Sequence, residues 1–511
     1  MLLRGVTEVL LAPRPLTSPA MRRIAIHAHF YQPPREDPWT GEIPLQPGAA
    51  PAHDWNERVH SESYRPNAFA RIPGSDEERI VNNFERLSFN VGPTLLSWME
   101  KADPETYRRI VEADRESAAR LGHGNAIAQA FHHTILPLSP PRDVRTQVRW
   151  GLADFRHRFG RDAEGIWLPE TATNDAVLGI LIDEGIAFTI LAPSQASRWQ
   201  DADGNWHAPP VDTRLPHRFL HPDGSGRSIS LFFYDGEIAR MIAFEGAAAS
   251  AERLLTMFEE RMEPSAEAGI VHAATDGETY GHHQVFTELG LAYALFVGAQ
   301  QRDLEITNYA AYLAAHPPDR NVRVIGGEGS SWSCAHGTGR WSRDCGCSTG
   351  GDPGWDQRWR APLRAALDLM REVADETFER LAGELLFDPW AVRDEYIDVF
   401  IGARSLDDLV QAHQSKPLDD DDRRQVEDLL ELQRHAMAMY TSCGWFFNDV
   451  GGIETVQVLT YAAAVVGLMK KMGQPVPKKD FLDLLEQARS NDPAIGTGAD
   501  VYQRIKRPVL G

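Results

Sequence analysis

The feature that most constrains the fold is a regular alternation between residues 22 and 325, where short apolar runs rich in β-branched residues are separated by longer amphipathic stretches. This alternation is typical of βα units, in which each strand of a parallel sheet is followed by a helix. We predict strands at RIAIHAHF, GIWLPE, AFTILAP, SISLFFY, GIVHAAT and VRVIG, and helices at residues 104–121, 142–159, 174–185, 247–261 and 288–299. One barrel could hold all of these elements.

The pattern changes after a loop rich in Gly, Trp and Cys. Residues 359–511 carry long stretches rich in Ala, Leu, Arg and Glu with a 3.6-residue period, which predicts a helical domain. We therefore divide the chain into a βα domain at 22–330, the loop at 331–358 and the helical domain at 359–511. For residues 1–21 we expect a disordered tail or a start-codon artefact, because their only apolar stretch is too short for a secretion signal.

The composition excludes several classes of partner. The chain of 511 residues has 52 Lys and Arg against 73 Asp and Glu, a net charge of −21, which argues against nucleic acid or an anionic membrane as the main partner. A neutral substrate fits this charge better. Four cysteines in so long a chain do not make a disulfide framework, so we expect a cytoplasmic protein. No apolar run approaches the length of a membrane span. The sequence does not indicate an oligomeric state.

Two carboxylates follow predicted strands. Glu170 closes the run GIWLPE, and Asp276 comes directly after GIVHAAT. Because the carboxyl ends of parallel strands meet at one rim, these side chains could converge there. Paired carboxylates are the machinery of glycoside hydrolysis. Asp235, which ends another predicted strand, is the best rival of Asp276 for the role of acid.

Four segments, in order along the chain, resemble the four signatures of glycoside hydrolase family 57. His27–Pro33 is similar to the first, Gly122–Leu138 to the second, Gly165–Glu170 to the third and Asp276–His282 to the fourth. The resemblance covers roughly residues 22–330, while the C-terminal half resembles one branch of that family. It implies an incomplete (β/α)7 barrel followed by an α-helical C-terminal domain, within the α/β class.

The resemblance also implies a retaining mechanism without a cofactor, with Glu170 as nucleophile and Asp276 as general acid/base. The implied substrate is an α-glucan or maltooligosaccharide. A nucleophile must be ionised, so hydrogen-bond donors should surround Glu170, whereas Asp276 needs burial or a nearby negative charge to keep its proton. The two carboxyl groups should lie ~5 to 5.5 Å apart if the configuration is retained. Amylase-like hydrolysis, 4-α-glucanotransferase and branching activity stay open, with hydrolysis slightly favoured.

Substrate contacts are expected from these motifs and from nearby aromatic residues. His27 and His29 alternate on a strand, so both side chains point the same way, and an exposed indole can stack on a sugar ring. Glu278 is expected beside Asp276, either lining the subsite or supporting the acid. The predicted substrate-binding residues are His27, His29, Gln32, His133, Trp167, Glu278, His282, Trp332 and Trp445.

Two other functional classes remain open at this point. One is a metal-dependent, polysaccharide deacetylase-like hydrolase in which His27, His29 and an Asp would ligate Zn²⁺. The other is a glycan-binding protein without turnover. Each His could also be a satisfied core residue.

The segment SCAHGTGRWSRDCGC contains Cys334, His336, Cys345 and Cys347. Three interpretations compete for it: a structural metal site, a packed Gly-rich loop with buried thiols, and a redox pair. The spacings Cys-x-His and Cys-x-Cys are tighter than those of common structural zinc sites. We therefore predict a packed loop and assign no metal ligand.

Overall fold

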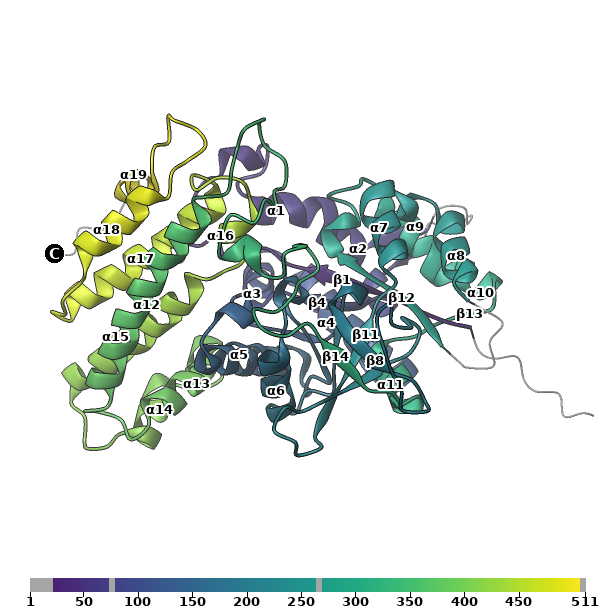
Figure 1. The fold of residues 1–511 in the computed structure, drawn as a ribbon, viewed down its shortest axis with the longest axis horizontal. Helices are drawn as coiled ribbons and strands as arrows, with labels where there is room; N and C mark the ends of the chain where they lie inside the picture. Colours follow the sequence, from purple (N-terminus) through teal and green to yellow (C-terminus); the bar gives the residue numbers. More distant parts are fainter. Residues whose placement is uncertain (1–21, 73–78, 263–268, 506–511) are drawn as a thin grey trace, which may run out of the picture.

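The structure is a computed structural model that describes residues 22–72, 79–262 and 269–505. Its fold is mixed α/β: strands and helices alternate in the first part of the chain, and helices dominate the described residues after position 360 (Figure 1). Residues 1–21, for which we predicted a tail or an artefact, lie outside the described residues.

The strand β1 (Arg22–Phe30) is the centre of the first sheet. It pairs in parallel with β12 (Ile270–Asp276), β4 (Ser88–Val91) and β13 (Leu304–Ile306). The register places His29 opposite both Asp276 and Asn90. Paired residues of parallel strands direct their side chains to the same face, so these three polar groups face one site.

A second sheet continues from the first. Its order is β10-β11-β7-β6-β5, and only the β10–β11 pair is antiparallel. Phe89 of β4 bridges in parallel to Ala126, just before β5, so the two sheets run on from one another. The bounds of these strands are His217–Leu220, Ser228–Phe233, Phe188–Leu191, Gly165–Trp167 and Ala128–Gln129.

Helices follow the strands as the sequence predicted. In α4 (Pro104–Leu121), Asp103 caps the N-terminus by accepting from the Thr106 N–H, which satisfies a backbone donor that the helix leaves free. Apolar residues of strands and helices form one continuous buried core. The other main helices of this part are α3 (Pro93–Ala102), α5 (Pro141–Phe159), α6 (Asp175–Asp183), α7 (Gly236–Glu245), α8 (Ala251–Glu260), α9 (Thr287–Tyr293) and α11 (Tyr309–Ala315).

The predicted strand VRVIG does not join the parallel sheets. It forms β14 (Val322–Val324), which pairs antiparallel with β8 (Ala196–Gln200). β8 in turn pairs with β9 (Trp206–His207), giving a small separate sheet. The periodicity identified the strand but not its partner, because pairing over more than 120 residues is set by the tertiary fold.

The C-terminal part is a helical domain with its own core. In Figure 1 the helices α12 (Arg360–Ala382), α15 (Asp420–Ala438), α17 (Ile453–Lys471) and α18 (Lys478–Gln487) run side by side. α12 contacts each of the other three, and α15 contacts α17. The remaining helices are α13 (Pro389–Phe400), α14 (Leu406–His413), α16 (Cys443–Phe446) and α19 (Gly498–Arg504).

Buried polar contacts fix the helical domain to α5. Arg393 of α13 is fully buried, and its guanidinium donates to Asp143 at 2.8 Å and to Thr146 at 2.7 Å. The Trp150 indole donates to the Arg393 carbonyl at 3.1 Å. A buried ion pair of this kind orients its two elements, because breaking it would leave an uncompensated charge.

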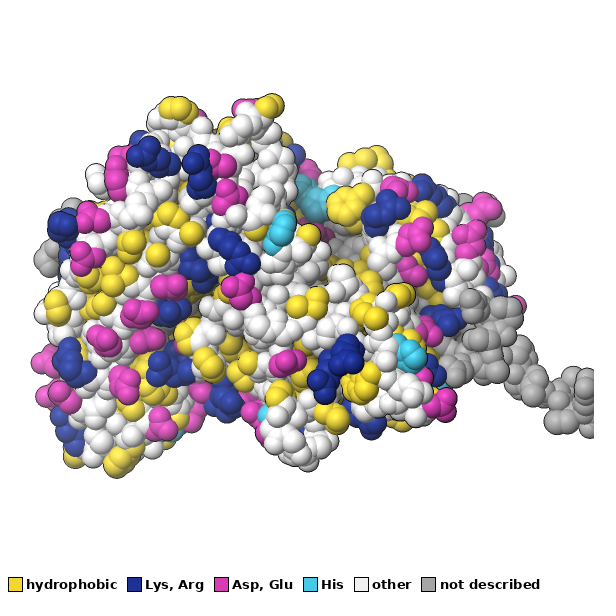
Figure 2. Space-filling model, viewed as in Figure 1, with side chains coloured by type: hydrophobic (Ala, Val, Ile, Leu, Met, Phe, Trp, Pro, Cys, Tyr) yellow, Lys and Arg dark blue, Asp and Glu magenta, His cyan; other side chains and the backbone are white. Residues whose placement is uncertain are grey.

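The helix α17 is long and apolar enough to cross a membrane by length and composition alone. It packs against α12, α15, α16 and α19, and 56% of its most apolar 18-residue stretch is buried. On the face shown in Figure 2, acidic and basic side chains are interspersed over the helical domain rather than gathered by sign.

Candidate active site

A tight turn presents the Glu170 side chain. β6 ends at Trp167, and the short 3₁₀ turn Pro169–Thr171 follows, in which Glu170 adopts the left-handed backbone conformation with φ 57° and ψ 22°. This conformation is uncommon for a residue with a side chain and persists only where the surroundings hold it. The backbone N–H of Trp332 donates to the Glu170 carbonyl at 3.1 Å and so secures the turn.

The Glu170 carboxylate is held by two donors from one loop. Its Oε2 accepts from the Trp332 indole at 2.9 Å and from the Ser333 hydroxyl at 2.6 Å. Burial raises the pKa of Glu170 above its ordinary value, and the two donors together with the positive charge of Arg340 work against that rise. The loop thus stabilises the ionised form of a half-buried carboxylate.

Asp276 is the last residue of β12 and has a contrasting environment. Its side chain is exposed to solvent within the cleft and lines the cavities there. Within the described part of the chain, its carboxylate accepts no hydrogen bond. Burial and the negative charges of Glu278 and Glu170 raise the pKa of Asp276 well above its ordinary value. The structure therefore favours a protonated Asp276.

Glu278 lies close to Asp276 and is buried. Its carboxylate accepts from the Tyr64 hydroxyl at 2.5 Å and from the Tyr31 backbone N–H at 3.0 Å. Burial raises the pKa of Glu278 to about 7, although these donors oppose the rise. Glu278 is therefore placed to act on the charge of Asp276 and also lines the same cavity.

Two adjoining cavities, of about 710 and 500 Å³, meet at the carboxylate pair. Both are lined by Glu170, Asp276, Trp332 and Phe446. The larger extends along α7 and the Cys-containing loop, and the smaller extends beneath the start of α17. A cleft open on both sides of two carboxylates can hold a chain substrate across them.

His29 and His133 form the wall behind the carboxylates. Their Nε2 atoms lie 3.2 Å apart, and their rings stack with the centroids separated by 5.2 Å. Asn90 contacts His29 Nδ1 at 2.8 Å, and the Ser442 hydroxyl contacts His133 Nδ1 at 2.7 Å. Burial lowers the pKa of His29 to about 3 and that of His133 well below its ordinary value, so both are neutral near pH 7. Both line the smaller cavity.

Two further predicted residues also line this cavity. Gln32 accepts from the Arg35 guanidinium at 3.0 Å, which fixes its amide. His282 is paired through Nδ1 with Glu62 and faces the same space. Trp332, predicted from its position in a loop, lines both cavities.

Three predicted substrate contacts lie in the core and are absent from the lining of both cavities. His27 is fully buried, with its ring nitrogens 3.0 Å from Ser88 and Asn90, and Trp167 stacks on it at 4.7 Å. Trp167 is itself fully buried between the two strand histidines and supports the wall from behind. Trp445 is fully buried as well: its indole donates to the Arg360 carbonyl at 3.3 Å, and Arg364 lies over its ring. Its neighbour Phe446 lines the cleft instead.

Asp235, the predicted rival acid, has another role. Its carboxylate caps α7 by accepting from the N–H groups of Glu237 and Ile238, both at 3.0 Å. It is absent from the lining of both cavities around Glu170.

The metal-dependent alternative finds little support in the geometry. Both ring nitrogens of His27 already have polar partners, and His29 contacts Asn90 and His133. Across the described ranges, one group of His, Cys, Asp and Glu side chains has the convergence that a metal needs, and it includes neither histidine.

Sequence reasoning missed several residues of the site. Ser333 and Arg340 lie in the Cys-containing loop, and Tyr64 ends the helical segment His60–Tyr64. Tyr234 directly follows β11 and lines the larger cavity. Phe446 was overlooked beside Trp445. A partial signal existed for Ser333, which directly follows the predicted Trp332, but nothing in a single sequence shows that it reaches Glu170.

Two carboxylates with opposed environments, one after β6 and one at the end of β12, line one cleft that is open on both sides. This is the arrangement that glycoside hydrolases use. The comparison with known families agrees with this description of the site. The model of "Glycosyl hydrolase family 57" matches residues 27–324, and that of "Domain of unknown function (DUF3536)" matches residues 355–510. The chain belongs to glycosyl hydrolase family 57.

Individual relatives are distant. The 4-alpha-glucanotransferase of Thermococcus litoralis is 22% identical over 272 residues, which are 51% of this chain and 36% of that protein. The chain spans about a third of the length of the curated relatives it matches.

Solved structures show a similar fold over most of the chain. An exo-type maltose-forming amylase from Pyrococcus sp. ST04 has a TM-score of 0.66 at 16% identity, covering 90% of this chain and 82% of that one. A branching enzyme from Thermococcus kodakaraensis has a TM-score of 0.54 at 15% identity, covering 94% and 96%.

Proposed function

We propose that this protein cleaves or transfers α-glucosidic bonds of an α-glucan by double displacement, with Glu170 as nucleophile and Asp276 as general acid/base. The observation that carries the proposal is the opposed treatment of two carboxylates in one cleft: donors favour the ionised form of Glu170, while negative neighbours favour the protonated form of Asp276. The α-glucan follows from the family and from the names of its relatives.

In the first step, Asp276 gives its proton to the glycosidic oxygen as the Glu170 carboxylate attacks the anomeric carbon. The bond to the leaving sugar breaks, and an ester to Glu170 forms. Asp276, now ionised, then takes a proton from water or from a sugar hydroxyl, whose oxygen attacks the anomeric carbon and releases Glu170. His29 and His133 beside this centre are neutral, so they add no charge that would change the ionisation of the two carboxylates.

We further propose that the parallel strands form the incomplete (β/α)7 barrel that the family resemblance implies. In support, β12-β1-β4-β5-β6-β7-β11 are connected in this order by pairing or by the Phe89–Ala126 bridge. The Asp235 N–H, just after β11, donates to the His272 carbonyl of β12 at 2.8 Å, a sparse contact at the point where a barrel would close. We also propose a reducing, cytoplasmic location, in line with the free thiols.

The test is incubation of wild type, Glu170→Gln and Asp276→Asn with maltoheptaose and with glycogen, followed by chromatography of all products. Shortened chains would show hydrolysis, and chains both longer and shorter than the substrate would show transfer. Loss of products in both variants is expected. An unchanged product pattern in either variant, or no product from wild type, would contradict the proposal. Binding of maltoheptaose without any turnover would point to a glycan-binding protein.

A further inference from the structure

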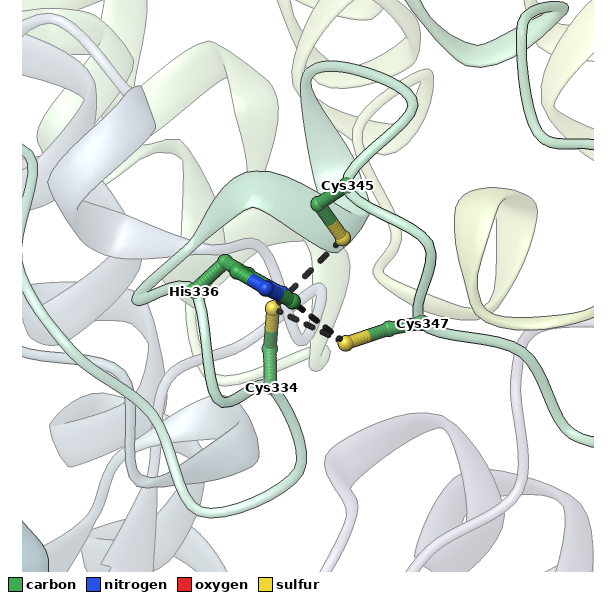
Figure 3. A group of neighbouring side chains, drawn as sticks. All are labelled: Cys334, His336, Cys345 and Cys347. Carbon is green, nitrogen blue, oxygen red and sulfur yellow. Dashed lines mark hydrogen bonds between the residues drawn. The ribbon is translucent and has the colours of Figure 1, made fainter.

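The most concentrated set of metal-binding side chains lies outside the carboxylate pair, in the loop that follows β14. Cys334, His336, Cys345 and Cys347 each offer a ligand atom, and these atoms all lie within 4.8 Å of one another. Figure 3 shows the three sulfurs and the imidazole turned toward one point from different stretches of the loop. Cys334 is buried, the other two cysteines are half-buried, and His336 is exposed.

The spacing of these atoms agrees with tetrahedral coordination of zinc. Two sulfurs bound at ~2.3 Å with a tetrahedral angle between them lie ~3.8 Å apart, and a sulfur and an imidazole nitrogen bound at ~2.05 Å lie ~3.6 Å apart. Cys334 Sγ is 3.8 Å from Cys345 Sγ and 3.7 Å from Cys347 Sγ. Cys347 Sγ is 3.4 Å from His336 Nδ1.

Glycines explain how so tight a sequence spacing converges. Gly346, between Cys345 and Cys347, has φ 81°, and Gly337, directly after His336, has φ 75°. These left-handed conformations reverse the chain within one residue and strongly favour glycine. The one-residue spacings that argued against a zinc site in the sequence are therefore compatible with one in this backbone.

The other two interpretations of the segment fit less well. Simply packed thiols would be expected in a buried apolar setting, whereas three of the four side chains reach the surface. A redox pair needs two sulfurs that can approach to ~2.05 Å, but Cys334 lies almost equally far from both of the others. Neither interpretation gives a role to His336.

We propose that these four residues bind one Zn²⁺ ion as a closed structural site, which holds the loop that supplies the donors to Glu170. Three thiolates and an imidazole form a donor set that suits zinc, and four protein ligands leave no position for substrate. Cys334 directly follows Trp332 and Ser333, the two residues that donate to Glu170. The role of the metal in positioning these two donors rests on the proposed function, whereas the binding of metal does not.

Additional contacts connect the site to the cleft. Arg340, between the two halves of the ligand set, donates to the Ser333 carbonyl at 3.1 Å and to the Phe446 carbonyl at 2.9 Å. Arg360 of α12 donates to the Cys347 carbonyl at 2.9 Å. A metal at the four ligands would therefore join the donor segment, the cleft residue Phe446 and the helical domain in one rigid unit.

The experiment is to express the full chain without a purification tag, in medium that contains zinc, and to measure metals per chain by plasma mass spectrometry. We expect about one zinc per chain in wild type and its loss in Cys345→Ser and Cys347→Ser, whose side chains are only half-buried. Replacement by Co²⁺ should give thiolate-to-metal charge-transfer absorption that is absent in both variants. Two matched controls, Cys443→Ser and the surface variant His157→Ala, should keep their zinc.

Absence of bound metal after reconstitution of folded wild type with Zn²⁺ would overturn the site, as would full zinc retention in both cysteine variants. A disulfide among these cysteines in wild type purified without reductant would overturn it in favour of the redox pair. For the positioning role, Cys345→Ser should move the acidic limb of the pH–rate profile upward, as loss of a donor to Glu170 would. Loss of zinc with an unchanged profile would refute that role, and these metal measurements stand whether or not the α-glucan assignment holds.

Discussion

The turn after β6 and the end of β12 each carry a carboxyl group, and the neighbours of these two groups favour opposite protonation states. At Glu170, an indole, a hydroxyl and a guanidinium favour the ionised carboxylate. At Asp276, two other carboxylates and the absence of a donor among the described residues favour the neutral acid. Both carboxylates line the same cleft, so their position alone does not assign the roles. The neighbours of each carboxylate do.

The largest effect should come from removing either carboxylate, and a substrate with a good leaving group should separate the two. With maltoheptaose, Glu170→Gln should lose all measurable turnover, and Asp276→Asn should fall by about 10²- to 10⁴-fold, the usual contribution of a general acid. With α-maltosyl fluoride, whose leaving group needs no proton, Asp276→Asn should recover the first step, seen as a burst of fluoride, while its steady turnover stays slow because the second step still lacks a base. Glu170→Gln should give no burst. Recovery in Glu170→Gln instead would reverse the two assignments.

Removal of one donor to Glu170 comes next in size. Ser333→Ala deletes a hydrogen bond to a charged group, worth about 1.5 to 3 kcal/mol, so kcat/KM should fall about 10- to 150-fold. Because the donor lowers the pKa of Glu170, its loss should raise that pKa and move the acidic limb of the pH profile to higher pH. Ser342→Ala, in the same loop but away from the carboxylate, is the control. A drop in rate without movement of the limb would show that Ser333 does not act through Glu170.

Removing the charge of Glu278 tests the protonation of Asp276 and should have a smaller effect. It helps to raise the pKa of Asp276, so Glu278→Gln should lower that pKa and move the alkaline limb of kcat/KM to lower pH. The exposed Glu252→Gln removes the same charge far from the cleft and should leave the limb in place. A shift to higher pH in Glu278→Gln would mean that Glu278 stabilises the ionised form of Asp276.

The smallest effect concerns the histidine wall. His29 lies opposite Asp276 in the sheet, and burial lowers its pKa to about 3. A charged imidazole there would lower the pKa of Asp276 and so favour the ionised form of both carboxylates. Nitrogen NMR of histidine-labelled protein, with His29→Gln for assignment, should show its ring neutral from pH 8 to 5. Titration of His29 within that range would contradict the proposed difference between the two carboxylates.

The sequence predicted most of the elements and both carboxylates because each depends on a local pattern. The Asp103 cap, the helix after it and the strand before Asp276 were all found close to their observed bounds. The partner of β14 was not found, since pairing depends on the assembled fold.

The side chains that surround the carboxylates were harder to predict. Ser333 reaches Glu170 across 163 positions, a contact that no single sequence displays. Trp445 and Phe446 are adjacent and equally apolar, yet one fills the helical core and the other lines the cleft, because the turn at α16 decides which ring faces outward. The convergence of the cysteine loop likewise depends on left-handed glycines that the sequence suggests only in retrospect.

The central claim is that Glu170 is the nucleophile of a double displacement. The most direct measurement is to incubate the protein with a 5-fluoro-α-glucosyl fluoride, which slows release of the glycosyl-enzyme, and to locate the label by peptide mass spectrometry. The account predicts one label per chain, on the carboxylate of Glu170. A label on Asp276 or Glu278, or steady turnover of the reagent without any labelled peptide, would contradict it.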